Sequence, residues 1–208
     1  MGVERPESGR QPDGRGGGPH PEGRTASGAA SRALPLAAAV LTGTVALTMA
    51  LIAFGNLTDF GTNREFVRHV LAMDTTFRDP HLMWRAVTSP ALQDAAYVAV
   101  IAWETVAAVV LGVATVRWCG ALRGGGTGRA RRTATAGLLM VLLLFGAGFL
   151  AVGGEWFAMW QSKQWNGLDA ATRNLTVAGI ALLVVHLPDP DRRLGGPPAE
   201  PPSHHVMR

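Results

Sequence analysis

Residues 134–152, ATAGLLMVLLLFGAGFLAV, decide the fold of this chain. The stretch holds no charged side chain, and Thr135 is its only polar one. As a helix with a rise of 1.5 Å per residue it would be about 28 Å long, close to the thickness of a bilayer core. A helix satisfies its own backbone hydrogen bonds, as lipid requires. The stretch therefore predicts a transmembrane helix.

Three other apolar runs lie on either side of it, at residues 35–57, 90–116 and 168–187. Each is long enough to cross a bilayer as a helix. Hydrophobic residues make up 48% of the 208 residues and charged residues only 16%, where soluble domains have roughly one quarter charged. We therefore predict an all-α membrane protein, with a four-helix transmembrane bundle at residues 33–187.

The two ends of the chain have a different composition. Residues 1–32 are rich in Gly, Pro, Ser and Arg, and residues 188–208 are rich in Pro. Segments with so few large apolar side chains cannot bury enough surface to offset the loss of chain entropy. We therefore expect a disordered tail at each end.

The basic residues are spread unevenly and predict the orientation. The segment between the second and third runs, RWCGALRGGGTGRARR at 117–132, holds five arginines and no acid. With the N-terminus inside, thirteen basic residues lie on the cytoplasmic side and six outside. The sequence thus predicts a multi-pass plasma-membrane protein with both termini cytoplasmic. Topology accounts for the net charge of +4, so we expect a lipid bilayer around the chain and no nucleic-acid partner.

The segment between the first and second runs, residues 58–89, contains a second kind of helix. Its apolar residues recur on one helical face, while arginines and a histidine lie away from it. This pattern is typical of a short interfacial amphipathic helix that lies on the outer membrane surface or covers the bundle. The residues of the face are Phe66, Val67, Val70, Leu71 and Met73.

Glu104 is an acidic residue near the middle of the second apolar run. An acid at this depth costs roughly 2.5–3.5 kcal/mol on insertion scales, so it must face the bundle interior. Thr44, Thr48 and Tyr97 are its candidate hydrogen-bond partners. One interpretation is a proton-accepting or cation-coordinating site on a transport path. The other is a protonated carboxyl group that joins helices and has no further role.

A second group of polar and aromatic residues is expected at the outer ends of the helices. Its histidines and acids lack the spacing of known metal motifs, and the chain has a single cysteine, so we predict no metal site, cofactor or catalytic residue with any specificity. The group comprises Asn56, Asp59, Asn63, His69, Asp74, Trp84, Arg85, Glu155, Trp156, Trp160, Trp165 and Asn166.

Three stretches carry a family resemblance: AFGNLTDFGTNREFVRHVLAMDTTF at 53–77, WRAVTSPALQDAAY at 84–97 and GGEWFAMWQSKQWNG at 153–167. In this order and spacing they resemble the bacterial family of predicted small integral membrane proteins, domain of unknown function 2165. The resemblance implies a four-helix membrane protein and brings no known activity. It also draws attention to the loops and helix ends, where polar and aromatic residues need a reason beyond spanning lipid.

Three functional hypotheses remain open from the sequence. The favoured one is a non-enzymatic accessory or assembly subunit that docks a membrane-protein partner through its outer face. The second is a small transporter or channel that uses Glu104 as a homo-oligomer. The third is an outer-face metal or ligand binder that uses His69, Asp74 and Glu155.

Overall fold

The structure, a computed structural model, describes residues 21–188, with side chains from residue 32 onward. It consists of helices, and this part of the chain contains no strand. The last turn of α4 continues directly into a π-helix, η2, so that the two form one rod. The elements are α1 (Pro21–Thr58), α2 (Phe60–Ala72), the short 3-10 helix η1 (Met83–Arg85), α3 (Pro90–Leu122), α4 (Thr127–Leu142), η2 (Leu143–Trp156), the short 3-10 helix η3 (Met159–Gln161) and α5 (Leu168–His186).

Four of these helical segments are long and apolar enough to cross a membrane: Arg32–Thr58, Pro90–Leu122, Thr127–Trp156 and Leu168–His186. They coincide with the four predicted runs, which confirms the predicted fold class. The second and third are longer than expected, because the second continues to Leu122 and the third extends from Thr127 to Trp156. The chain is therefore a multi-pass helical membrane protein.

The first helix begins much earlier than predicted. We expected a disordered tail to residue 32, whereas α1 starts at Pro21 and contains Pro35 in its interior. Residues 22–34 are mostly Ala, Arg, Ser and other residues compatible with a helix, so the apolar run is preceded by helix rather than by coil. The remaining parts of the two predicted tails, 1–20 and 189–208, lie outside the described residues.

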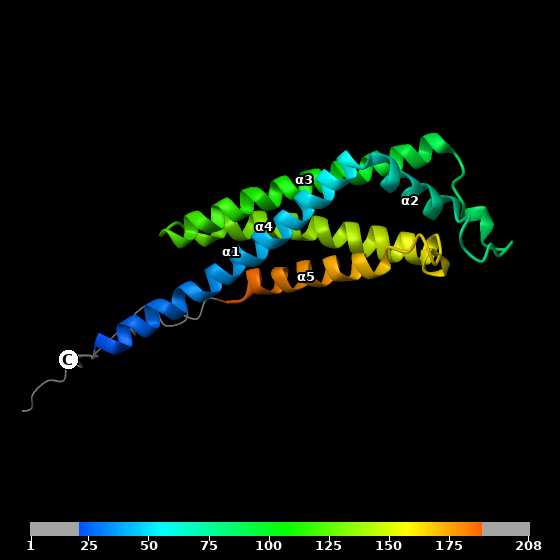
Figure 1. The fold of residues 1–208 in the computed structure, drawn as a ribbon. Helices are drawn as coiled ribbons and strands as arrows, with labels where there is room; N and C mark the ends of the chain where they lie inside the picture. The colour runs from blue at the N-terminus through cyan, green and yellow to red at the C-terminus, as the bar shows by residue number, and fades with distance from the viewer. Residues whose placement is uncertain (1–20, 189–208) are drawn as a thin grey trace, which may run out of the picture.

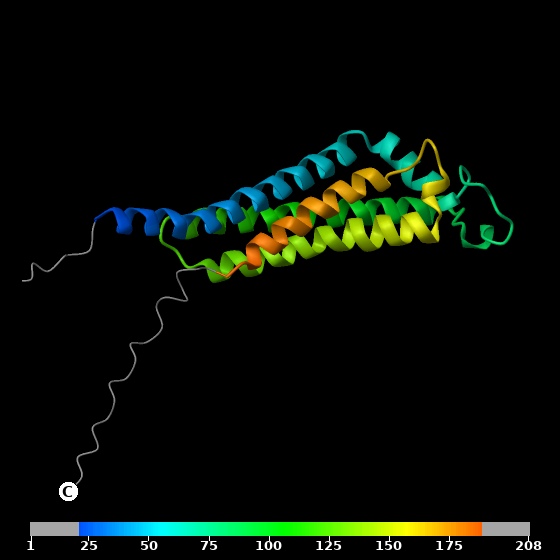
Figure 2. The same cartoon turned by 90° about the horizontal axis from the view of Figure 1, so that it is seen from below.

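The four long helices form a closed ring in which each contacts two neighbours. α1 packs chiefly against α3, α3 against α4, the α4–η2 rod against α5, and α5 against α1. The four helices extend in the same general direction, and α1 is tilted relative to the others (Figures 1 and 2). On α3, buried side chains recur every three or four residues and face the ring interior. They are Tyr97, Ile101, Glu104, Ala107, Leu111, Ala114 and Trp118.

The two ends of the bundle differ in character. One end, which we call the arginine end, holds the short connection between α3 and α4 and its flanking arginines. The opposite end holds residues 59–89 and 153–167, which we call the cap (Figure 1). Met73, Phe157 and Ala158 form a small buried apolar cluster within the cap.

α2 packs against α3, so the predicted amphipathic helix exists and covers one side of the bundle.

Candidate ligand cavity at Glu104

Glu104 faces the interior of the bundle, as the sequence predicts. Only 2% of its surface is exposed. The carboxylate oxygen Oε2 accepts a hydrogen bond of 2.6 Å from Asn56 Nδ2. Tyr97, two turns before Glu104 on α3, donates its hydroxyl to the backbone carbonyl of Asn56 at 2.9 Å. Asn56 therefore joins α1 to two residues of α3, and Tyr97 reaches Glu104 only through it.

The prediction that Thr44 and Thr48 bind Glu104 is wrong. Their hydroxyls donate to the carbonyls of Val40 and Thr44, each at 2.9 Å and each within α1. The register of α1 against α3 explains the difference. Gly43 lies against Thr115 and Asn56 lies beside Glu104, so Thr44 and Thr48 are level with residues of α3 beyond Glu104. A residue's depth along its own helix did not show which residue of another helix lies beside it.

We expect the Asn56–Glu104 bond to contribute measurably to stability. Asn56→Leu removes the only donor to the buried carboxyl group among the described residues, which should cost about 1–3 kcal/mol. Thr44→Val removes a hydroxyl that bonds only its own helix, so its effect should be under about 0.5 kcal/mol. Thermal unfolding of the two variants in the same detergent gives the comparison. Equal losses would contradict the assigned partnership.

Glu104 lies on the wall of a cavity of about 290 Å³. Its lining comes from α1, α2, α3, η2 and α5, so the cavity exists only where these elements meet. The wall is mainly apolar, with one acid, three asparagines and a tyrosine. The lining residues are Ile52, Asn56, Asn63, Phe66, Val67, Tyr97, Val100, Glu104, Phe145, Phe149, Gly167, Ala170, Ala171 and Asn174. A mainly apolar wall with a few polar groups is the usual composition of a small-molecule site.

The sequence prediction missed Asn174, which α5 contributes to the cavity. A signal for it existed in the spacing. Asn174 lies three residues after the buried Ala171 and four before the buried Ala178, so it shares the inward face of α5. A polar residue on the inward face of a transmembrane helix is a candidate for function, even when it carries no charge.

A second cavity of about 140 Å³ adjoins the first. It lies between α2, α3 and η2, and every side chain in its wall is apolar. The two cavities share Phe66, Val67, Val100 and Phe149. The apolar face predicted for α2 thus forms a wall common to both cavities.

The π-helix η2 supplies aromatic rings to the Glu104 cavity. Phe145 and Phe149 are four residues apart on η2, with ring centroids 5.5 Å from each other. Phe149 also stacks on Phe66 of α2 at 6.5 Å. π-helical segments are rare and occur frequently at functional sites. Three phenylalanine rings therefore surround the same space as Glu104.

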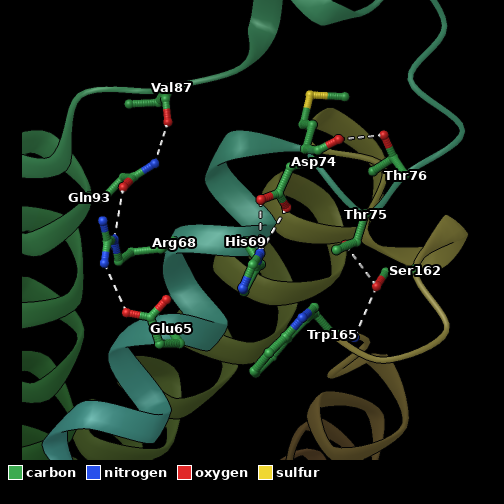
Figure 3. Close-up of polar contacts among 11 residues, drawn as sticks. Glu65, Arg68, His69, Asp74, Thr75, Thr76, Val87, Gln93, Ser162 and Trp165 are labelled. Carbon is green, nitrogen blue, oxygen red and sulfur yellow. Dashed lines mark hydrogen bonds and ion pairs between the residues drawn. The ribbon is translucent and has the colours of Figure 1, made fainter.

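Polar contacts hold α2 against the start of α3. Arg64 Nε donates to Asp94 Oδ1 at 2.6 Å, and its Nη2 forms an ion pair with the other carboxylate oxygen. Arg68 bonds both Glu65, at 2.8 Å, and Gln93, at 3.3 Å (Figure 3). The arginines that lie near the cavity are thus already paired with polar groups outside it.

The other predicted outer residues do not meet in one site. His69 Nδ1 lies 2.9 Å from Asp74, and its ring stacks on Trp165 at 4.7 Å (Figure 3). Glu155 is exposed and does not join them, and within residues 21–188 no three His, Cys, Asp or Glu side chains converge as metal ligands would. The remaining polar members act locally at helix starts. Asp59 precedes α2 and accepts a hydrogen bond from Asn63, and Asn166 accepts one from the backbone N–H of Leu168.

The exposed tryptophans of the cap form two separate groups. The guanidinium of Arg85 lies 4.8 Å from the ring centroid of Trp156 and 5.6 Å from that of Trp84. Trp160 makes an edge contact with Phe77 at 5.9 Å. Trp84 is 69% exposed and Trp160 52%. The cap therefore presents large aromatic surfaces outside the bundle core.

The fold and the cavity at Glu104 together define a small four-helix integral membrane protein with a cavity between its helices. The chain belongs to the family described as predicted small integral membrane protein (DUF2165), which matches residues 34–188. No curated protein and no solved structure matches it. The family assignment confirms the resemblance noted in the sequence.

Proposed function

We propose that the protein is a small transporter that binds its solute in the Glu104 cavity and works as a homo-oligomer. The observation that carries the proposal is a buried carboxyl group on the wall of a cavity of about 290 Å³, inside a membrane-spanning bundle. Acids within membrane helices are costly and commonly mark solute or ion paths. Asn56, Asn63 and Asn174 are partly exposed, so the cavity opens to the surface of the bundle.

The opposite half of the bundle supports a carrier rather than an open channel. Towards the arginine end, Ala107, Leu111, Ala114, Trp118 and Leu138 are at most 2% exposed and fill the ring. Close-packed side chains of this kind leave little room for a solute. Passage therefore requires movement of the helices.

A flux experiment tests this proposal. The full chain is reconstituted in liposomes, and uptake of three labelled probes that do not cross lipid unaided is measured: benzyltrimethylammonium, glucose and succinate. We expect at least one probe to enter faster than into empty liposomes, and Glu104→Gln to remove that uptake. Glu155→Gln is the matched control, because Glu155 is exposed and lies outside the cavity. Equal uptake by the native chain and Glu104→Gln would count against transport through this site.

A second candidate function is that of an accessory or assembly subunit that docks a membrane-protein partner through the cap. The supporting observation is the exposed group of Trp84, Arg85 and Trp156, since tryptophan and arginine are enriched at the centres of protein interfaces. A partner found by purification from native membranes should be lost in Trp84→Ala combined with Trp156→Ala. It should be kept in Phe54→Ala, which changes an exposed apolar side chain of α1.

For the orientation, we propose that the cap faces outward and the arginine end faces the cytoplasm of a plasma membrane. The five arginines of residues 117–132 support this arrangement. Cytoplasmic loops of membrane proteins carry an excess of Lys and Arg. A solute would then reach Glu104 from the outer half of the bundle.

A further inference from the structure

The charge of the cavity wall indicates what kind of solute it takes. Glu104 is the only ionisable carboxyl group in the wall, and no Lys, Arg or His lines the cavity. The nearby Arg64 and Arg68 are paired with Asp94 and Glu65, outside the wall. An ionised carboxylate at this depth is stable only if a positive charge joins it, and the surrounding residues supply none.

The wall offers free acceptor oxygens beside Glu104, together with the unused amide N–H groups of its asparagines. Asn56 already donates to Glu104, and Asn63 donates to the carbonyl of Asp59 at 3.2 Å. Tyr97 donates its only hydroxyl hydrogen to the carbonyl of Asn56. The side-chain oxygens of Asn56 and Asn63 have no donor among the described residues, and neither has Glu104 Oε1. A ligand that donates N–H groups complements these oxygens.

The rest of the wall suits the apolar part of such a ligand. Phe66, Phe145 and Phe149 line the cavity, and the face of an aromatic ring attracts a cation. The cavity volume of about 290 Å³ is large enough for a ligand with one aromatic ring, since an apolar cavity of about 150 Å³ already holds benzene. The adjoining apolar cavity extends the space available to a longer body.

We infer that the solute is an organic ammonium ion, with its charged nitrogen at Glu104 and its apolar body against the phenylalanine rings. This inference rests on the proposed transport through the same cavity and names the class of its substrate. The ammonium replaces the missing countercharge of Glu104 and donates to the free amide oxygens of Asn56 and Asn63. Carboxylates are excluded by repulsion from Glu104, and neutral molecules lack the ion pair.

Calorimetric titration of the full chain in nanodiscs tests the inference with three probes of similar shape: benzylammonium, benzyl alcohol and benzoate. Empty nanodiscs correct for partition into lipid. We expect benzylammonium to bind the native chain at least about tenfold more tightly than benzyl alcohol, a preference equal to one well-placed ion pair. Benzoate should show no binding. Equal affinity for the alcohol and the ammonium would overturn the inference.

Two variants show whether the preference arises in this cavity. Glu104→Gln should weaken benzylammonium binding about tenfold and leave benzyl alcohol unchanged, whereas Glu155→Gln should change neither. Phe145→Leu, which keeps Glu104, should weaken benzylammonium and benzyl alcohol alike, each about three- to tenfold, because both carry the ring that packs against Phe145. Unchanged ammonium binding in both cavity variants would overturn the inference.

The binding experiment tests the ligand class and the flux experiment tests transport, so either claim can be rejected without the other. Selective ammonium binding without uptake into liposomes would leave the ligand class standing and reject transport. Uptake of glucose or succinate that depends on Glu104, without ammonium binding, would support transport and reject the ligand class.

Discussion

In intact cells, a membrane-impermeant maleimide is expected to label His81→Cys almost completely and to leave Gly126→Cys at background. Each change is made in its own variant, which also carries Cys119→Ser, because Cys119 is the only native cysteine. His81 is exposed in the cap, and Gly126 lies at the start of α4 in the arginine end. A side chain at residue 126 meets no atom within 4 Å, so the new cysteine is accessible to a reagent on its own side.

The physical basis of this prediction is the retention of basic segments on the cytoplasmic side during insertion. Permeabilised cells provide the control, since both cysteines should then react. The opposite pattern would place the cap in the cytoplasm and the proposed solute entry on the inner side. Labelling of both sites in intact cells would contradict a fixed orientation of the bundle.

Gly137→Leu is expected to lower the thermal stability of the bundle more than any other single change proposed for this chain. A Cβ atom at Gly137 would lie 2.7 Å from both Cγ and Cδ2 of Leu111, and 3.2 Å from Val110 Cγ1. Leu111 is fully buried, so it cannot move aside without displacing α3 from α4. Overpacking of this kind costs about 3 kcal/mol, which corresponds to roughly 6–12 °C in a domain of this size.

Gly112→Leu is the matched control for this effect. Gly112 lies in the middle of α3, and a Cβ there meets no atom within 4 Å. Both substitutions gain the same intrinsic helix propensity, so the difference between them isolates the contact with Leu111. Unfolding followed by near-ultraviolet circular dichroism in detergent gives the comparison. A stability for Gly137→Leu that equals that of Gly112→Leu would show that α3 and α4 do not pack as described.

Much of the candidate site could be predicted one helix at a time. The depth of Glu104 along an apolar run was sufficient to predict that it faces inward, because an acid facing lipid is too costly. The apolar face of α2 followed from its spacing, and it now forms part of the cavity wall. Both predictions depend on the period of a single helix and need no knowledge of its neighbours.

Contacts between helices could not be predicted in the same way. Thr44 and Thr48 were placed beside Glu104 on the assumption that α1 and α3 run side by side at equal depth. The register of the two helices, in which Gly43 lies against Thr115, brings Asn56 there instead. The predicted group of outer polar and aromatic residues is also separated in the structure, because its members lie on different helices and loops. Asn56 and Asn63 line the cavity, and His69 and Trp84 belong to separate parts of the cap.

The sequence by itself determined that the chain crosses a membrane four times and buries one acid, because apolar length and the cost of charge in lipid act on each segment independently. Only the tertiary structure decided that Asn56 bonds this acid and that Asn174 and three phenylalanine rings share its cavity. Those neighbours depend on the register and the angles at which helices pack. The angles follow from side-chain packing between segments far apart in the chain, which no local pattern of residues encodes.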